Sequence, residues 1–359
     1  MKIGIVGLPN AGKSSLFSAL TGVAAEAANY PFTTIDPNVA VVPVADERLD
    51  AVAQTVRASK VVPDTITFHD IAGLVAGAHR GEGLGNQFLA NIRETDAIVH
   101  VVRVHRDPNV VHPEGRVDPL ADVATIETEL LYADLEQAER RLERVARSAK
   151  SGDRHAVAEE AWLRRLIEAL QAGRPAQTVP PPADAPDAVS LLAPLTAKPV
   201  LYVANVDEGS AEVPPELEEY AREQGAAAVA VSARLEAELA ELEPEEAAAM
   251  RAELGIGESG LEAVIRGAFS LLDLIAFFTA GEDKPAQSWH VRRGLSAWQA
   301  AGLIHSDMQR GFVRAEVISW EDLVDAGGYA GARERGTLRV EGRDYLVADG
   351  DVITIRFTP

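Results

Sequence analysis

The chain begins with an alternation of short apolar segments and stretches of helical or loop character. The apolar segments at residues 3–6, 39–44, 65–70 and 97–102 each have the length and composition of a strand. The last of them is an almost continuous apolar run, which is typical of a central strand in a parallel sheet. This alternation predicts an α/β domain wound around a mostly parallel sheet.

A different pattern begins near residue 121, where apolar residues recur at intervals of four and three. They are Leu131, Leu135, Ala138, Leu142 and Val145. This spacing predicts the apolar seam of a long amphipathic helix, and a second helix is predicted at residues 157–170 after a break at 151–153. We therefore expect an antiparallel helical hairpin over residues 121–190, bounded by Pro119 and by a proline-rich stretch.

The α/β pattern returns after the hairpin. Strands are predicted at residues 199–204 and 226–231, and an acidic helix at 236–254. The hairpin therefore interrupts a single domain, which we expect to comprise residues 1–120 and 195–277.

The end of the chain has a third pattern, in which short strands alternate with turns. Strands are predicted at residues 289–291, 312–318, 337–340 and 352–357. The mixture of short strands with one or two helices predicts a small α+β domain over residues 278–359.

The composition excludes several classes of protein. The 359 residues contain no cysteine, which rules out disulfides, thiolate metal sites and thiol catalysis. No apolar run approaches the roughly 20 residues that span a bilayer, and no secretory leader precedes the first strand. We therefore expect a cytoplasmic protein with no membrane partner.

The formal net charge of −21 is unevenly distributed along the chain. Residues 205–262 hold 16 Asp and Glu against 3 Lys and Arg, whereas residues 284–359 hold 10 of each sign. The balanced C-terminal region is therefore free to meet a polyanion such as RNA. Its candidate phosphate contacts are Arg292, Arg293, Arg310, Arg314, Arg333 and Arg335.

Residues 7–14 fit the pattern GxxxxGK[ST], the phosphate-binding loop of nucleoside triphosphatases. The loop follows a predicted strand and precedes a predicted helix, so its backbone N–H groups can surround a phosphate at the positive end of the helix. In this arrangement Lys13 reaches the β- and γ-phosphates, and the Ser14 hydroxyl ligates Mg²⁺.

Two further segments complete the expected phosphate site. Asp70 begins a DxxG motif directly after a strand, where it would contact Mg²⁺ through water, and the Gly73 N–H would meet the γ-phosphate. Between this motif and the loop, a threonine hydroxyl would complete the Mg²⁺ shell. We assign this role to Thr34, with Thr33 as the alternative.

The base-reading segment favours adenine. GTP-binding proteins place Asn-Lys-x-Asp where this chain has Asn205-Val206-Asp207-Glu208. Val206 replaces the lysine that covers the ring, and the longer Glu208 replaces the aspartate that reads guanine. A site built on specific hydrogen bonds discriminates through their geometry, and Asn205 can still bond an adenine edge. We therefore expect ATP to be preferred.

These motifs together resemble the YchF/Obg-like ATPase family, and the resemblance covers essentially the whole chain. The matching segments are residues 7–14, 29–38, 70–75, 81–89, 205–208, 312–315 and 344–345. The resemblance implies a P-loop domain, an inserted coiled-coil hairpin and a C-terminal TGS domain of the β-grasp type. It also implies ATP hydrolysis in preference to GTP, and association with ribosomes. RNA contact through the TGS-like domain is an expectation from the arginines named above.

The resemblance also implies roles for individual residues. The phosphates would be surrounded by Asn10, Ala11, Gly12, Lys13, Ser14 and Ser15. Val206 would touch the base through its backbone, with Asn205 and Glu208 completing the base-contacting set. Asn10 lies at a position that binds K⁺ in cation-stimulated relatives, so K⁺ joins Mg²⁺ as an expected cofactor.

Two positions depart from the family pattern. His105 stands where phenylalanine is common, close to the expected base pocket, and Trp298 stands where proline is usual in the TGS-like segment. The first departure bears on how adenine packs. The second bears on the surface of the C-terminal domain.

Hydrolysis in this chain needs a group other than the usual glutamine to orient the attacking water. Many switch proteins orient the attacking water with a glutamine directly after DxxG, but this chain has Leu74 there. The catalytic candidates are Lys13 and His112, the latter because the family has a histidine at the matching place. His69 and His100 are expected to lie in the core or at strand ends.

Three functions remain open at this stage. The first is a slow, Mg²⁺-dependent ATPase that acts as a ribosome-associated switch. The second is a module that binds the ribosome or RNA and uses ATP only as an ordering ligand, which Leu74 makes plausible. The third is a GTPase of the Obg type.

Overall fold

The computed structural model describes residues 1–26, 38–71, 84–107, 110–112, 115–254 and 259–358. The chain divides into two compact units. The first comprises Met1–Val42 and Thr67–Leu271, and the second comprises Pro43–Ile66 and Leu272–Pro359. No described helix has the length and apolar character needed to cross a membrane.

The first unit is built on a six-stranded sheet with the order β2-β4-β1-β5-β6-β7. Its strands are β1 (Lys2–Val6), β2 (Val39–Pro43), β4 (Thr65–Asp70), β5 (Ala97–Arg103), β6 (Val200–Asn205) and β7 (Ala227–Val231). The pairings of β1 with β4 and β5, and those along β5, β6 and β7, are parallel. Every residue of β5 is buried, as expected for a strand covered on both faces.

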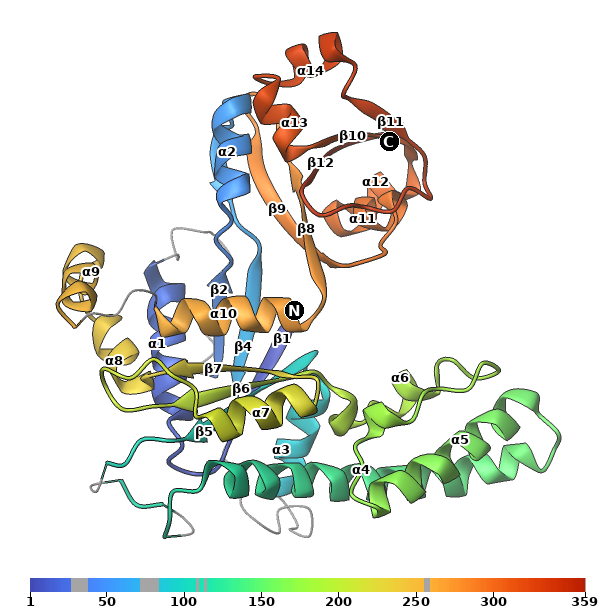
Figure 1. The fold of residues 1–359 in the computed structure, drawn as a ribbon. Helices are drawn as coiled ribbons and strands as arrows, with labels where there is room; N and C mark the ends of the chain where they lie inside the picture. The colour runs from blue at the N-terminus through green and yellow to red at the C-terminus, as the bar shows by residue number, and fades with distance from the viewer. Residues whose placement is uncertain (27–37, 72–83, 108–109, 113–114, 255–258, 359) are drawn as a thin grey trace. The chain divides into compact units, whose positions relative to one another are not determined.

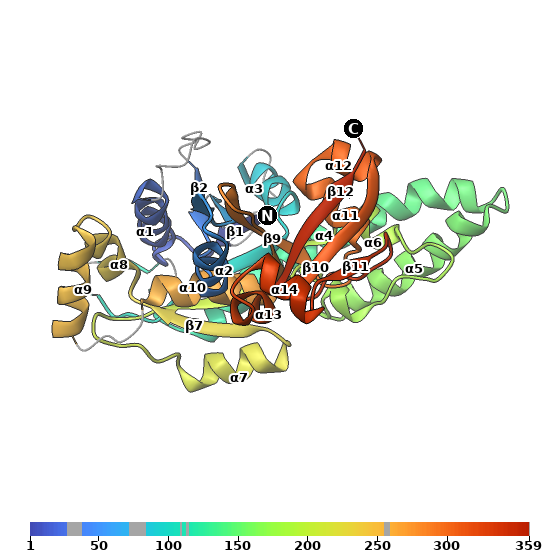
Figure 2. The same ribbon diagram turned by 90° about the horizontal axis from the view of Figure 1, so that it is seen from above.

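Helices cover both faces of this sheet. The helices of the unit are α1 (Lys13–Glu26), α3 (Leu84–Arg93), α4 (Pro119–Ala149), α5 (Arg154–Gln171), α6 (Ala188–Leu192), α7 (Pro215–Glu223), α8 (Ala233–Leu239), α9 (Pro244–Glu253) and α10 (Gly260–Leu271). Helices α1 and α10 pack on one face, and α3, α4 and α7 on the other (Figure 1 and Figure 2). The mostly parallel α/β fold predicted from the sequence is confirmed.

Helices α4 and α5 pack along each other where the hairpin is predicted. Asp118 and Asp153 cap their N-termini by accepting backbone hydrogen bonds. The contact between the two helices buries Trp162, Leu163 and Leu166, which are at most 1% exposed. Two 3₁₀ turns, Ala176–Thr178 and Leu195–Ala197, lead the chain back to β6. The coiled-coil character of the hairpin stays a prediction.

The acidic segment at 236–254 is not the single helix predicted from its composition. The chain forms α8 and α9 instead, and Glu243 between them has an extended backbone. Pro244 occupies the first turn of α9, where a backbone N–H would have no partner within the helix. In the interior of a helix a proline removes a hydrogen bond and clashes with the preceding turn, so α8 cannot extend through Pro244 into α9.

The second unit contains a mixed six-stranded sheet with the order β11-β10-β12-β8-β9-β3. Its strands are β3 (Lys60–Val62), β8 (Leu274–Thr279), β9 (Pro285–Arg292), β10 (Phe312–Ser319), β11 (Arg339–Glu341) and β12 (Asp351–Phe357). Its helices are α2 (Glu47–Val56), α11 (Ala297–Ile304), α12 (Ser306–Arg310), α13 (Trp320–Asp325) and α14 (Tyr329–Arg335). The unit is of the α+β type that the sequence predicts.

The boundaries of the two units differ from the predicted domains at residues 43–66 and at the start of the C-terminal domain, which begins at Leu272 and not at the predicted residue 278. Residues 43–66 were assigned by sequence to the α/β domain, but the structure places them in the second unit. The reason is that β3 pairs in parallel with β9, while Leu49 and Val52 of α2 pack in one core cluster with Leu323. Strand β8 was also not predicted, because its apolar residues directly follow those of α10.

Candidate functional site

The loop that joins β1 to α1 needs glycine at two positions. A Cβ atom on Gly7 would lie 2.4 Å from the carbonyl oxygen of Val101, and one on Gly12 would lie 2.1 Å from Asn205 Nδ2. Gly12 also has φ +101°, a backbone conformation that side chains disfavour. The glycines of the sequence motif therefore let the loop approach the neighbouring strand ends closely.

Lys13 and Asp70 form the charged part of the site. Lys13 is 8% exposed, and its ammonium donates to the carbonyl oxygen of Leu8 at 2.8 Å. Burial lowers the pKa of Lys13, and the charge of Asp70 partly offsets this effect. Burial likewise raises the pKa of Asp70, and the charge of Lys13 opposes the rise. Each side chain thus favours the charged form of the other.

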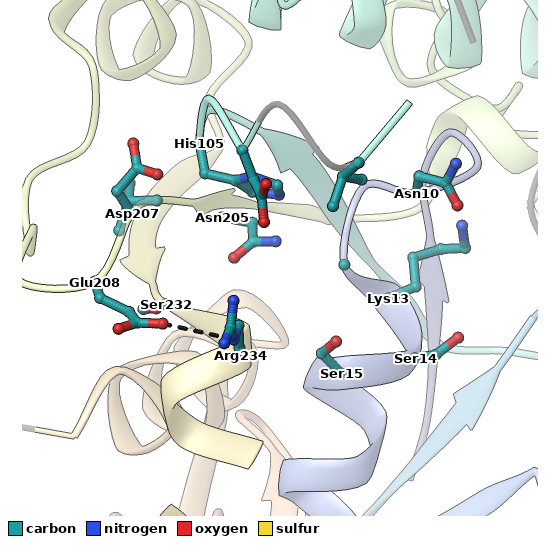
Figure 3. Close-up of a pocket in the computed structure, with 14 residues that line it drawn as sticks. Asn10, Lys13, Ser14, Ser15, His105, Asn205, Asp207, Glu208, Ser232 and Arg234 are labelled. Atoms are coloured by element: carbon teal, nitrogen blue, oxygen red, sulfur yellow. Dashed lines mark ion pairs between the residues drawn. The ribbon is translucent and has the colours of Figure 1, made fainter. Parts of the chain in front are cut away.

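A cavity of about 340 Å³ opens beside this loop (Figure 3). From the loop and the start of α1 it is lined by Asn10, Gly12, Lys13, Ser14 and Ser15. From the opposite side it is lined by Asn205, Val206, Asp207 and Glu208, the segment that the sequence predicts to read the base. The structure therefore brings together two motifs that lie almost 200 residues apart in the chain.

The remaining predicted site residues that the structure describes are not among those that line this cavity. Ala11 is buried, and its carbonyl oxygen faces Asn205. Asp70 ends β4, the neighbour of β1 in the sheet. Thr33, Thr34, Gly73 and Leu74 lie outside the described residues, so their roles stay predictions.

Asn205 joins the two sides of the site. Its Nδ2 donates to the carbonyl oxygen of Ala11 at 2.9 Å, and its Oδ1 accepts from the N–H of Ala233 at 3.0 Å. Asn205 is 4% exposed, so both bonds are largely shielded from water. Its amide thus ties the phosphate loop to the start of α8, a role that the sequence analysis did not foresee.

Arg234 is a lining residue that sequence reasoning missed. Its Nε lies 3.6 Å from Oε1 of Glu208 (Figure 3), and 3.0 Å from Oε1 of Glu238. The signal was present, because Arg234 closely follows β7, and the carboxyl ends of parallel strands meet at one edge of a sheet. His105, Asp107, Val110 and Ser232 complete the lining.

His112 does not line the cavity in this structure. Its Nε2 lies 2.9 Å from Asp122 Oδ2 on α4, and both residues are buried. The segment that carries it is nevertheless attached to the phosphate loop, because Asn10 Nδ2 donates to the carbonyl oxygen of Val111 at 3.0 Å.

His100 is buried in β5, as expected for a core residue. Burial, together with the charge of Lys13, lowers its pKa to about 3. His100 is therefore neutral at physiological pH.

The strand–loop–helix with its buried lysine, at the carboxyl edge of a parallel sheet, defines a P-loop nucleotide-binding protein. Comparison with known proteins narrows this class. Residues 2–139 match the family model described as "50S ribosome-binding GTPase". Residues 274–358 match the YchF C-terminal family model, described as "Protein of unknown function (DUF933)".

Relatives match over nearly the whole chain. "Ribosome-binding ATPase YchF" of Bacillus subtilis (strain 168) is 49% identical over 360 residues, covering 99% of this chain and 98% of the relative. The protein of the same name from Haemophilus ducreyi is 50% identical, covering 99% of each. The solved "Structure of the Schizosaccharomyces pombe YchF GTPase" has a TM-score of 0.86 at 35% identity, covering 99% and 97%. The chain belongs to the YchF family, which confirms the predicted family.

The close approach of the loop to Asn205 gives a first prediction. In Gly12→Ala the added Cβ would displace the Asn205 amide, so we expect the Kd for a fluorescent nucleoside triphosphate to rise at least tenfold. Gly152→Ala is the matched control, because Gly152 also has a positive φ but has nothing within 4 Å of its Cβ position. Equal Kd values for the two variants would contradict the proposed role of the loop.

Proposed function

We propose that this chain is a Mg²⁺-dependent ATPase that associates with the ribosome. The observation that carries the proposal is the phosphate loop at the start of α1, with buried Lys13 facing a cavity whose other wall is the segment that reads the base. Membership of a family whose relatives are named ribosome-binding ATPases supports the same function.

Each part of the phosphate site has a proposed task. The N–H groups of Asn10 through Ser15 hold the phosphates, and Lys13 neutralises charge at the β- and γ-phosphates. Ser14 and Thr34 would ligate Mg²⁺, Asp70 would act through water, and the Gly73 N–H would meet the γ-phosphate. Hydroxyl and carboxylate oxygens are the ligands that Mg²⁺ prefers, so the residues at this site fit the ion. Bound Mg²⁺ would supply charge neutralisation at the phosphates.

The preference for ATP is proposed to follow from the contacts of Glu208. A carboxylate at this position could accept the N1–H and amino hydrogens of guanine, but here it is drawn toward the Arg234 guanidinium. Adenine presents an unprotonated N1, which a carboxylate repels and a guanidinium N–H can meet. The pairing thus occupies the carboxylate that would accept hydrogen bonds from guanine, and it places a guanidinium that can donate a hydrogen bond to adenine. The N–H of Val206 already donates to the carbonyl oxygen of Val231. Val206 would therefore contact the base through its own carbonyl oxygen or its side chain.

Slow turnover is the expected consequence of Leu74 and of the position of His112. A leucine cannot orient water, and His112 must leave Asp122 before its ring can reach the phosphates. The burial of His112 also favours the second candidate function, a ribosome-binding module that ATP orders with negligible turnover. Activation by K⁺ through Asn10 remains part of the proposal.

Contact between the second unit and RNA is also a proposal. Of the candidate arginines, Arg293 lies 3.5 Å from Asp273 and Arg314 lies 3.7 Å from Glu316, while Arg310 pairs with Asp307. These acidic partners reduce the positive charge offered to a phosphate. Arg333 and Arg335, at the end of α14, are the better candidates.

Base selectivity gives a second prediction. We expect the unmodified chain to bind ATP at least tenfold more tightly than GTP, a difference of about 1.4 kcal/mol. In Arg234→Ala, Glu208 loses its guanidinium partner, so the ratio of the two Kd values should shift toward GTP by about fivefold or more. Glu238→Gln is the control, because Glu238 contacts Arg234 without lining the cavity. Equal ATP and GTP affinities in the unmodified chain would overturn the proposed base preference.

Catalysis gives a third prediction. If His112 positions water or stabilises charge, His112→Ala should slow single-turnover ATP hydrolysis by on the order of 10²-fold while ATP affinity changes little. His155→Ala is the control, since His155 pairs with an aspartate, Asp187, on the exposed surface. An unchanged rate in His112→Ala, with the fold intact by circular dichroism, would remove His112 from the mechanism.

A further inference from the structure

A second cavity, of about 310 Å³, lies at the opposite edge of the first unit's sheet. It is lined by Val200, which starts β6, and by Ala226, which directly precedes β7. The nucleotide cavity is lined instead by Asn205 and Ser232, at the carboxyl ends of the same two strands. The two cavities share no lining residue in the described part of the chain.

The polar centre of this second cavity is a carboxylate held by two phenols. The hydroxyl of Tyr202 donates to Oε1 of Glu127, and that of Tyr220 donates to Oε2. Burial, and then the neighbouring Glu127, raise the pKa of both phenols far above the physiological range. Both tyrosines therefore stay protonated, and the cluster keeps the single negative charge of Glu127.

Among the described residues of the cavity wall, no cation pairs with this carboxylate. Lys198 is the one basic residue among the described lining residues, and its ammonium is engaged elsewhere, donating to the carbonyl oxygens of Arg93 and Thr95. A partly buried carboxylate without a cationic partner is costly, and hydrogen bonds from neutral phenols offset only part of that cost. A cation that entered the cavity would supply the missing charge.

The remaining walls specify what kind of cation fits. The rings of Tyr202 and Tyr220 meet edge to face, with centroids 5.9 Å apart, and aromatic faces attract ammonium and guanidinium groups. Leu130, Leu131 and Leu271 provide apolar surface for a hydrocarbon stem. An anion would be repelled by Glu127. A bare divalent metal would find one carboxylate whose two oxygens already accept phenol hydrogens, far fewer oxygen ligands than it needs.

We propose that this cavity binds an organic cation, an ammonium or guanidinium group carried on a short apolar stem. The charged group pairs with Glu127 between the two tyrosines, and the stem packs against the leucines. The volume lies at the small end of the range for ligand pockets, so a compact ligand fits. The proposal goes beyond ATP hydrolysis and does not depend on it.

Solution NMR with a small probe tests the proposal. The 359-residue chain, labelled with ²H and ¹⁵N, is titrated with butylammonium chloride, and butan-1-ol serves as a neutral probe of similar shape. We expect saturable shifts confined to the backbone amides of the cavity, such as those of Tyr202 and Ala226, with butylammonium and much smaller ones with butan-1-ol. Glu127→Gln should weaken the binding of butylammonium at least fivefold.

Two further variants make the outcome decisive. Glu139→Gln removes the same charge from an exposed position of α4 outside the cavity, and should leave the affinity within twofold. Ala226→Leu fills part of the cavity without changing its charge, so it should also weaken the binding of butylammonium. If Glu127→Gln does not fold, the affinity of Ala226→Leu alone tests whether the cavity is the binding site. Absence of saturable shifts, equal losses in Glu127→Gln and Glu139→Gln, or unchanged binding in Ala226→Leu would each overturn the proposal.

Discussion

The nucleotide site depends on the side-chain amide of Asn205. This group joins the carbonyl of Ala11, in the phosphate loop, to the N–H of Ala233, at the start of α8. Without it, two largely buried backbone groups would lose their partners, at a cost of about 1–3 kcal/mol each. The approach is close enough that position 12 has no room for a side chain. The loop proposed to bind phosphate and the segment proposed to read the base are thus joined by a residue that sequence patterns assign to the base alone.

Much of this arrangement could be predicted from the sequence. The strands of the first sheet, the phosphate loop and the base-reading segment all depend on local patterns, namely apolar runs followed by specific short motifs. The prediction failed where the deciding contact is distant in sequence. Residues 43–66 belong to the second unit because they pack against β9 and α13, which lie more than 200 residues later in the chain. His112 and Arg234 lie closer in the chain to their partners, Asp122 and Glu208, but no local sequence pattern marks these contacts, which depend on how the chain folds.

The break between α8 and α9 is a different kind of failure, because the local signal was present. Pro244 lies within the acidic stretch and disfavours helical backbone at the residue before it, and this effect prevails although the surrounding glutamates and alanines have high helical propensity. The same region supplies Glu236, which accepts hydrogen bonds from Ser259 and Gly260 and pairs with Arg251. Part of the chain's strongly acidic character is therefore structural and ties α8 to the helices that follow.

As part of the proposed function, we propose that the nucleotide held by the loop controls association with the ribosome. Co-sedimentation of the purified protein with ribosomes, in ATP and in ADP and over a range of salt concentrations, tests it most directly. The account predicts that the bound fraction differs at least threefold between the two nucleotides, falls as salt rises, and loses its nucleotide dependence in Lys13→Ala. An equal bound fraction in ATP and ADP, or no sedimentation at low salt, would contradict it.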